Sequence, residues 1–191
     1  MLAAAREAIK NGLVAVAPCS GFHHAGYAEV AGFCTFNGLM VAALALHSSA
    51  QAKRVGILDF DEHYGNGTDD IIDRLKIDWI CHHSEGKEHR SPNDAEPFLV
   101  RVASIVEAMG DCDVILYQAG ADPHVDDPLG GWLTTGQLFE RDIHVFETAR
   151  RLGVPIAWNL AGGYQTPLRK VLDIHDNTMR ACATSYLSSP R

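Results

Sequence analysis

The segment from Ile57 to Gly67 joins a short apolar stretch to a turn rich in glycine and acidic side chains. The residues from Arg54 to Leu58 predict a buried β-strand that runs into this turn. Alternate residues of an extended chain point to the same side, so Asp59, Asp61 and His63 are expected to face one point. Open α/β sheets bind ligands at the carboxyl ends of their strands. The segment therefore predicts a metal site, and the alternative is an ordinary strand exit with solvated acids.

Three other segments carry polar residues supported by glycine directly after an apolar, strand-like stretch. They are the histidine pair His23 and His24, the residues from Gly120 to His124, and the residues from Asn159 to Tyr164. Paired histidines can serve as bases, acids or metal ligands. A tandem pair without further context is more often a pair of polar surface residues, so its role depends on the other segments.

The chain alternates predicted strands with predicted helices. Strands are expected at residues 13–17, 54–58, 78–81, 114–118 and 154–158, and helices at residues 3–11, 36–48, 69–75, 97–109, 135–152 and 167–187. This alternation predicts an α/β fold, a three-layer sandwich with a mainly parallel sheet covered by helices on both faces. At 191 residues the chain is long enough for such a core, and we expect one domain over residues 1–191. Periodicity does not reveal the order of the strands.

The charge and the cysteine content limit the partners and the compartment. A formal charge of −8 gives no general attraction to nucleic acid or anionic membranes, and it favours a cationic substrate. We therefore expect no nucleic-acid partner and no membrane partner. The five cysteines form no CxxC pair, and the chain shows no signal peptide and no apolar run of membrane length. Reduced thiols in a cytoplasmic protein are the simplest interpretation.

Six ordered motifs give the chain a resemblance to the zinc-dependent histone deacetylase superfamily, which includes the acetylpolyamine amidohydrolases. The motifs are HHA at residues 23–25, GFC at 32–34, DFDEHYGNGT at 59–68, GAD at 120–122, DPLGG at 127–131 and GGY at 162–164. No single motif would be sufficient, but their order and spacing match from about Met1 to Tyr164. The resemblance implies a reduced arginase/deacetylase-like sandwich with the strand order one, five, four, two, three.

The resemblance implies that Asp61, His63 and Asp122 bind a metal ion. Three protein ligands and an open fourth position are typical of a catalytic Zn²⁺ site, and the oxygen-rich ligand set is also compatible with Fe²⁺, Co²⁺ or Mn²⁺. The alternative for Asp122 is a cap of a turn or helix. A K⁺ site formed by the backbone carbonyls of Asp59, Asp61 and His63 is compatible with the resemblance, with Cys81 where many members have a serine.

The resemblance also implies the catalytic groups. His24 is expected to be the main general base and acid, and His23 its electrostatic partner. Their far ring nitrogens are expected to meet Asn66 and Asp59 respectively, because a carboxylate favours the imidazolium whereas an amide orients the ring without adding charge. Tyr164 would donate its hydroxyl to the developing oxyanion. The alternative for Tyr164 is a side chain that merely covers the start of a helix.

These roles predict a metal-dependent amidohydrolase that removes an acyl group, such as acetyl, from a small N-acyl amine or an acyl-lysine through a metal-bound water. Phe33 is expected to form one wall of the acyl channel, and Gly120 to allow close backbone approach beside a metal ligand. One alternative is a non-catalytic metal-binding or interaction protein on a shortened deacetylase scaffold. A ureohydrolase is disfavoured, because such enzymes resemble a two-metal site with more paired aspartates.

Two departures from the family pattern affect this interpretation. Residues 82–90 are short, charged and free of aromatic side chains, where family members usually have a second aromatic wall. Members also usually carry extra strands and loops before the segment that begins here at Met1. The strand at residues 13–17 would then be a bare apolar edge, and such edges are usually covered or paired. We therefore predict a homo-oligomer that covers this edge or its flanking helices.

Overall fold

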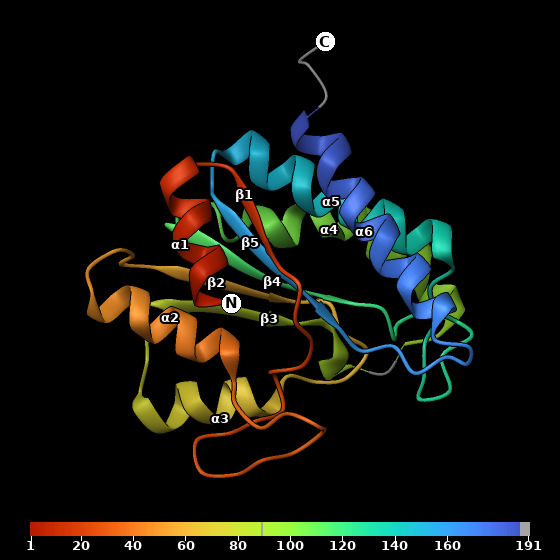
Figure 1. Cartoon of the computed structure of the whole chain (residues 1–191), viewed down its shortest axis with the longest axis horizontal. Helices are drawn as coiled ribbons and strands as arrows, with labels where there is room; N and C mark the ends of the chain where they lie inside the picture. Colours follow the sequence, from red (N-terminus) through yellow and green to blue (C-terminus); the bar gives the residue numbers. More distant parts are fainter. Residues whose placement is uncertain (89, 188–191) are drawn as a thin grey trace.

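The computed structural model describes residues 1–88 and 90–187, and it contains a parallel five-stranded sheet (Figure 1). The strands are β1 (Val14–Ala17), β2 (Val55–Asp59), β3 (Ile80–Ser84), β4 (Val114–Gly120) and β5 (Ile156–Ala161). Their order is β1-β5-β4-β2-β3 and every pairing is parallel, which confirms the α/β expectation. The central strand β4 thus lies between β2 and β5, and β1 and β3 form the two edges.

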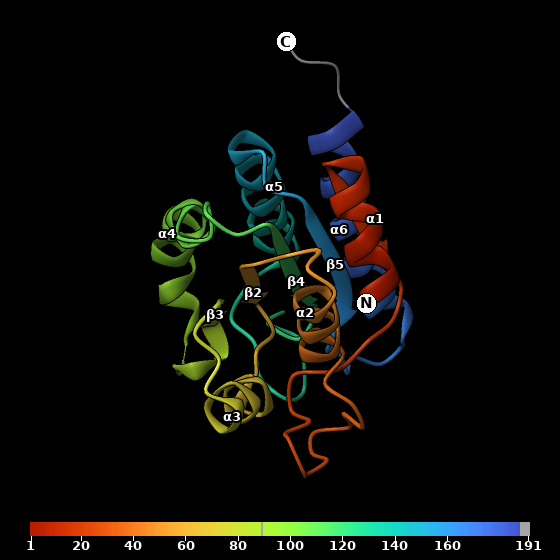
Figure 2. The same ribbon diagram turned by 90° about the vertical axis from the view of Figure 1, so that its left-hand side faces the viewer.

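Helices cover both faces of the sheet, as Figures 1 and 2 show. The described residues form α1 (Leu2–Asn11), α2 (Gly38–Ser48), α3 (Asn66–Leu75), α4 (Ala95–Glu107), α5 (Thr135–Leu152) and α6 (Arg169–Leu187). Two short 3₁₀ turns, η1 (Glu85–Lys87) and η2 (Pro92–Asp94), connect β3 to α4. Helices α1 to α3 pack on one face and α4 to α6 on the other. Among these helices, none combines the length and the apolar character that a membrane span requires.

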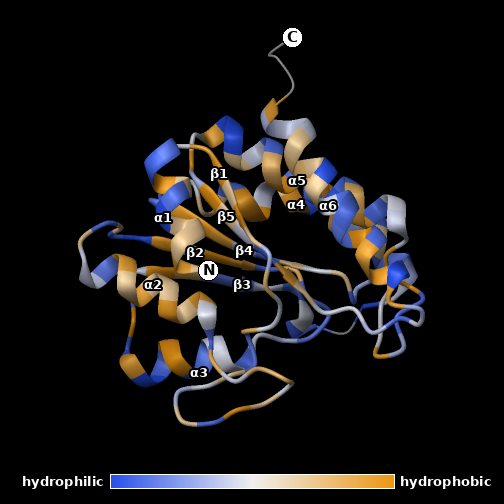
Figure 3. Ribbon diagram, in the orientation of Figure 1, coloured by the Kyte–Doolittle hydropathy of each residue, from blue (hydrophilic) through white to orange (hydrophobic). Residues whose placement is uncertain are grey.

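Alternate side chains of the strands supply two separate hydrophobic cores. In β4, Val114 and Leu116 pack with α1 and α2, whereas Ile115 and Tyr117 pack with α4, α5 and α6. All four residues are fully buried, as expected for a central strand covered on both faces. Figure 3 shows the apolar strands between the helical layers, with β3 as the polar exception. The core therefore holds β2, β4 and β5 in place up to their carboxyl ends.

Local side-chain chemistry determines where several helices begin and end. Asn37 caps α2 by accepting a hydrogen bond from Met40 N. Thr134 and Gln137 form a capping box at the start of α5, and Gly153 ends this helix with a φ of 70°. Such caps satisfy backbone groups that the helix itself leaves unpaired.

Several boundaries differ from the sequence expectations. We expected a strand at residues 78–81, but β3 extends to Ser84 because the backbone of His82 to Ser84 pairs with β2. Helix α3 begins at Asn66 rather than residue 69, directly after the turn that carries the acidic segment. Strands β4 and β5 continue to Gly120 and Ala161, where their ladder still pairs. Polar or small residues at these ends had suggested loops, whereas backbone pairing with a neighbouring strand decides the boundary.

Candidate metal centre and active site

The carboxyl ends of four neighbouring strands bring the candidate residues to one edge of the sheet. Asp61 and His63 follow β2, Asp122 follows β4, and Tyr164 follows β5. The loop after β1 carries His23 beside them. Because parallel strands all end at the same edge, segments far apart in the sequence meet here.

Asp61, His63 and Asp122 form a cluster that can hold a metal ion. Each offers one ligand atom, and these atoms lie within 4.8 Å of one another. His63 Nδ1 lies 3.0 Å from Asp122 Oδ2 and 3.3 Å from Asp61 Oδ1. The two carboxylates are buried, whereas the His63 side chain is one-third exposed. The two carboxylates are thus shielded from solvent, whereas the imidazole is partly open to it.

Two glycines allow the carboxylates to approach so closely. A Cβ at Gly162 would lie 2.2 Å from Asp122 Cγ, and a Cβ at Gly120 would lie 2.5 Å from Asp61 Cα. Gly162 also has a φ of 54°, a left-handed conformation that favours glycine. The backbone of Gly120 therefore packs closely against Asp61, as expected for a glycine beside a candidate metal ligand.

The expected alternation of Asp59, Asp61 and His63 on one strand does not describe how these residues are arranged. Strand β2 ends at Asp59, and the residues that follow lie in a bend. The Asp59 carboxylate turns toward His23 instead, and it accepts a hydrogen bond from Asp61 N at 3.1 Å. Asp59 thus lies outside the metal cluster, because the extended backbone ends at Asp59 and does not continue through Asp61 to His63.

The donor set fits a divalent cation. Burial and the charge of Asp122 raise the pKa of Asp61, because two adjacent carboxylates in a region of little water resist ionisation. Hydrogen bonds to these carboxylates raise the pKa of His63 to about 10. A bound dication neutralises both carboxylates and accepts the lone pair of the imidazole. Zn²⁺ accepts a ligand set of two oxygens and one nitrogen, and Fe²⁺, Co²⁺ and Mn²⁺ accept it too.

His23 and Asp59 form a buried ion pair. His23 Nδ1 lies 2.7 Å from Asp59 Oδ2, and its Nε2 lies 3.5 Å from Asp61 Oδ1. Burial lowers the pKa of His23, but the charge and the hydrogen bond of Asp59 outweigh this effect and raise the pKa to about 9. His23 is therefore a cation at neutral pH, held between a partner carboxylate and the metal cluster.

His24 is oriented by an amide instead of a carboxylate. Its Nδ1 donates to Asn66 Oδ1 over 2.7 Å, since the amide oxygen can only accept, and this leaves Nε2 with a free lone pair. Burial lowers the pKa of His24 despite that hydrogen bond. The ring centroid lies 4.0 Å from that of His23 and 5.9 Å from that of His63. His24 thus has a lowered pKa beside a histidine whose pKa is raised.

Tyr164 and Phe33 lie on the open side of the site. Both residues line a cavity of about 290 Å³ together with His23, His24 and Asp61. Their ring centroids are 6.1 Å apart, and Phe33 is 90% exposed. Burial and the nearby carboxylates raise the pKa of Tyr164 to about 12, so the hydroxyl keeps its proton and can donate it in a hydrogen bond. Phe33 and Tyr164 therefore form an aromatic side of the cavity.

The segment after β3 provides no second aromatic wall among the residues the structure describes; His89 lies outside them. Its turn η1 packs close to the metal site instead, since a Cβ at Gly86 would lie 2.3 Å from the carbonyl carbon of His63. The register of β3 also corrects an expectation about Cys81. Cys81 pairs with Gly56 near the far end of the strand, whereas Ser84 pairs with Asp59 and donates to its carboxylate over 3.4 Å.

Two buried residues near the site escaped the sequence analysis. Gln118 donates to Asp59 Oδ1 over 3.4 Å. Arg141, on helix α5, donates to the backbone carbonyls of Phe60 and Gly120. A charged residue in a helix usually indicates a solvated face, so no sequence signal distinguished Arg141 from an exposed arginine.

Known proteins that are similar to this chain in sequence include histone deacetylases. The sequence model described as the histone deacetylase domain matches residues 1–102. An uncharacterised protein from Picosynechococcus sp. is 30% identical over 199 residues, which cover 95% of this chain and 66% of that protein. Histone deacetylase 6 from Caenorhabditis elegans is 29% identical over 187 residues, which cover 81% of this chain and 19% of that protein.

A solved structure has a similar fold. The crystal structure of an acetylpolyamine aminohydrolase from Burkholderia pseudomallei superposes with a TM-score of 0.74 at 23% identity. The alignment covers 96% of this chain and 60% of that one. The chain thus spans less than two thirds of the length of each of these relatives.

Removal of one carboxylate tests the metal cluster. Asp61→Ala is expected to weaken Zn²⁺ binding by more than about 100-fold, since it removes a ligand itself rather than a supporting residue. Isothermal titration with a competing chelator measures this affinity. Asp127→Asn is the matched control, because the Asp127 carboxylate binds Tyr164 N at the same edge and not the cluster. Equal Zn²⁺ affinity of Asp61→Ala and the wild type would contradict the assignment.

Substitutions of Asn66 test the environment of His24. Asn66→Asp adds a negative charge next to the ring and is expected to raise the pKa of His24 by roughly 1 unit. Asn66→Ala removes a hydrogen bond that favours the imidazolium, so it is expected to lower that pKa further. NMR titration of the ring in the metal-free protein measures both values. Shifts in the same direction for the two variants would disprove the expected pairing.

Proposed function

This chain belongs to the histone deacetylase superfamily, and we propose on that basis that it is a metal-dependent amidohydrolase. The proposed reaction removes an acyl group, such as acetyl, from an N-acyl amine or an acyl-lysine. One observation carries the proposal. The cluster of Asp61, His63 and Asp122 lies beside two histidines, one paired with a carboxylate and the other with an amide, at a cavity that Tyr164 lines.

The chemistry of amide hydrolysis requires a polarised carbonyl and an activated water. A divalent ion held by Asp61, His63 and Asp122 supplies Lewis-acid polarisation of the carbonyl and acidifies water. Two carboxylate ligands neutralise much of the charge of that ion, so the reaction needs a nearby base. His24 fits this need, because its pKa is lowered and its Nε2 carries a free lone pair. We assign to His24 the removal of the water proton and its transfer to the departing amine.

His23 and Tyr164 stabilise charge in the proposed mechanism. The cationic ring of His23, held by Asp59, offsets negative charge that develops beside the cluster. Tyr164 remains protonated at neutral pH, and its hydroxyl can donate to the oxyanion of the tetrahedral intermediate. The backbone N–H of Tyr164 donates to Asp127 over 2.8 Å, which supports the turn that directs the ring toward the cavity.

The resident ion is proposed to be Zn²⁺, with Fe²⁺, Co²⁺ and Mn²⁺ as compatible alternatives. The three ligands provide an oxygen-rich set, which leaves the choice among these ions to availability and geometry. A K⁺ ion near the carbonyls of Asp59, Asp61 and His63 remains part of the proposal. The β3 residue beside this proposed K⁺ site is Ser84 rather than Cys81, because Ser84 pairs with Asp59.

We propose a small N-acylated amine or an acyl-lysine side chain as the substrate. The related structure from Burkholderia pseudomallei is described as an acetylpolyamine aminohydrolase. The formal charge of −8 favours a substrate that keeps a positive charge, such as an acylated polyamine with a free amine, over an anionic one. Phe33 can contact the methylene chain of either substrate at the rim, because it faces the cavity and is exposed.

A non-catalytic role on the same scaffold is the second candidate. The observation in its favour is the open rim of the cavity, where Phe33 is 90% exposed and its ring lies 6.1 Å from that of Tyr164. A protein of this kind would bind a metal ion or a partner and would not turn over. Catalytic measurements on the folded, metal-loaded chain distinguish the two candidates.

Tyr164→Phe tests the proposed reaction. Loss of an oxyanion donor is worth roughly 3 kcal/mol in the transition state, so kcat is expected to fall about 100-fold. Zn²⁺ affinity should be unchanged, because Tyr164 lies outside the cluster. Steady-state hydrolysis of acetyl-lysine amides and acetylated polyamines by the Zn²⁺-loaded protein provides the measurement.

Tyr27→Phe is the matched control, since Tyr27 is an exposed tyrosine that does not line the cavity. Unchanged kcat in Tyr164→Phe would refute the oxyanion role. No turnover by folded, metal-loaded wild type on the whole panel would favour the non-catalytic candidate.

A cytoplasmic location of the protein is proposed, because its five cysteines are unpaired.

We also propose that the protein self-associates. Strand β1 pairs only with β5 among the described residues, so its outer edge is free for another strand. Leu13, next to this strand, is about half exposed. Sedimentation velocity at micromolar concentration is expected to show a dimer or a larger assembly. A monodisperse monomer would disprove this proposal.

A further inference from the structure

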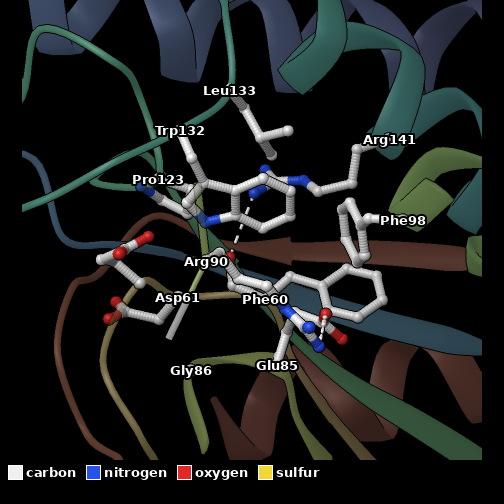
Figure 4. A pocket seen from close by; sticks show the side chains of 11 residues that line it. Phe60, Asp61, Glu85, Gly86, Arg90, Phe98, Pro123, Trp132, Leu133 and Arg141 are labelled. Atoms are coloured by element: carbon white, nitrogen blue, oxygen red, sulfur yellow. Dashed lines mark hydrogen bonds and ion pairs between the residues drawn. The ribbon is translucent and has the colours of Figure 1, made fainter. Parts of the chain in front are cut away.

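Arg141 is a fully buried charge behind the metal cluster. It belongs to helix α5, and its exposed fraction is 0%. Figure 4 shows its side chain extending toward Phe60, across a small cavity from Asp61. An arginine is almost never fully buried unless it is paired, so this position needs a structural explanation.

Asp142 compensates the charge of Arg141. Arg141 Nε and Nη2 both lie 2.9 Å from Asp142 Oδ1. The hydroxyl of Tyr117 donates to the same oxygen over 2.5 Å, and Thr178 Oγ1 donates to Asp142 Oδ2 over 2.6 Å. The carboxylate is therefore fully hydrogen-bonded, and its network fixes the guanidinium in one orientation between β4, α5 and α6.

The remaining nitrogen of Arg141 connects the two strand ends that carry the carboxylate ligands. Arg141 Nη1 donates to the carbonyl of Phe60 over 3.1 Å and to the carbonyl of Gly120 over 3.0 Å. Phe60 directly precedes Asp61, and Gly120 lies two residues before Asp122.

Backbone pairing alone does not hold these strand ends together. The ladder between β2 and β4 ends at Asp59 and Gln118, and Phe60 N donates to Gln118 O just beyond it. Beyond this point the two segments form no further ladder pair, and Glu62 N donates to Asp122 Oδ1 over 3.2 Å. Arg141 bridges them where the ladder has ended, and a planar guanidinium can hold two carbonyls and one carboxylate in fixed directions.

We propose that Arg141 is a positioning residue of the metal site, which sets the separation of Asp61 and Asp122 by bridging the carbonyls of Phe60 and Gly120. This inference rests on the proposed metal-dependent function. Arg141 acts through the backbone and does not touch the substrate. The cavity between Arg141 and Asp61 measures about 10 Å³, which is room for about one water molecule.

Co²⁺ binding tests this proposal without any catalytic assay. The visible absorption of bound Co²⁺ reports the coordination geometry, and titration against a chelator gives the affinity. Arg141→Lys keeps the positive charge, but a single ammonium nitrogen replaces the fork that reaches Asp142 and both carbonyls. Co²⁺ affinity is expected to fall about tenfold, as for other residues that orient metal ligands, and the absorption spectrum should change.

A second variant keeps the proposal testable if Arg141→Lys does not fold. Arg141→Met alone would leave Asp142 as an unpaired buried charge, so it is combined with Asp142→Asn. The double variant is expected to lose at least as much Co²⁺ affinity as Arg141→Lys. Arg150→Met is the matched control, because Arg150 lies on the same helix and donates to the carbonyl of Ser185, away from the cluster. It should lower thermal stability without changing the Co²⁺ spectrum or affinity.

The outcomes separate this inference from the proposed function. Wild-type protein that binds no Co²⁺ would overturn the metal-dependent function, and the role of Arg141 would fall with it. Wild type that binds Co²⁺, with both Arg141 variants retaining its affinity and spectrum, would overturn the role of Arg141 alone. An equal loss of affinity in Arg150→Met would also overturn it, because the effect would then follow general stability rather than the bridge.

Discussion

The candidate site depends on the close approach of two buried carboxylates, Asp61 and Asp122. Like charges in a region of little water repel one another, so the fold must hold them together until a cation neutralises them. The fold meets this requirement with adjacent strands, β2 and β4, and with glycines that leave room for the carboxylates. The cores on both faces fix the strands, and the ligand residues lie where the strand ladder stops. The two carboxylates are therefore held close together just beyond the point where the β2–β4 ladder ends.

Sequence patterns predicted the layers of the fold and most of the candidate site. The strands form where apolar stretches indicated them. The partners of His23 and His24 are those that the family resemblance implied. Family resemblance supplied the strand order, which periodicity does not contain. Family resemblance indicated the cluster of Asp61, His63 and Asp122, whereas the expected alternation along one strand was wrong for Asp59.

The features that escaped prediction depend on contacts between distant segments. The polar residues of β3 suggested a loop, yet the register with β2 places Ser84 beside Asp59. Arg141 looked like any helical surface arginine, and only the packing of α5 against the strand ends shows that it is buried. Register and burial are set by the whole sheet, so neither can be read from the residues around one position.

The two halves of the site are supported by opposite layers of the sandwich. The carboxylate ligands are held from the side of α4 to α6, through Arg141 and the core beneath Phe60. The histidine loop is held from the other side, because Thr68 N donates to His23 O and Asn37 Nδ2 donates to Ala25 O. Loosening of α2 and α3 would therefore displace the histidine loop, which carries the proposed proton-transfer group, and leave the contacts of Arg141 intact. For the proposed metal-dependent enzyme, metal content alone would therefore be no measure of the active fraction of a preparation.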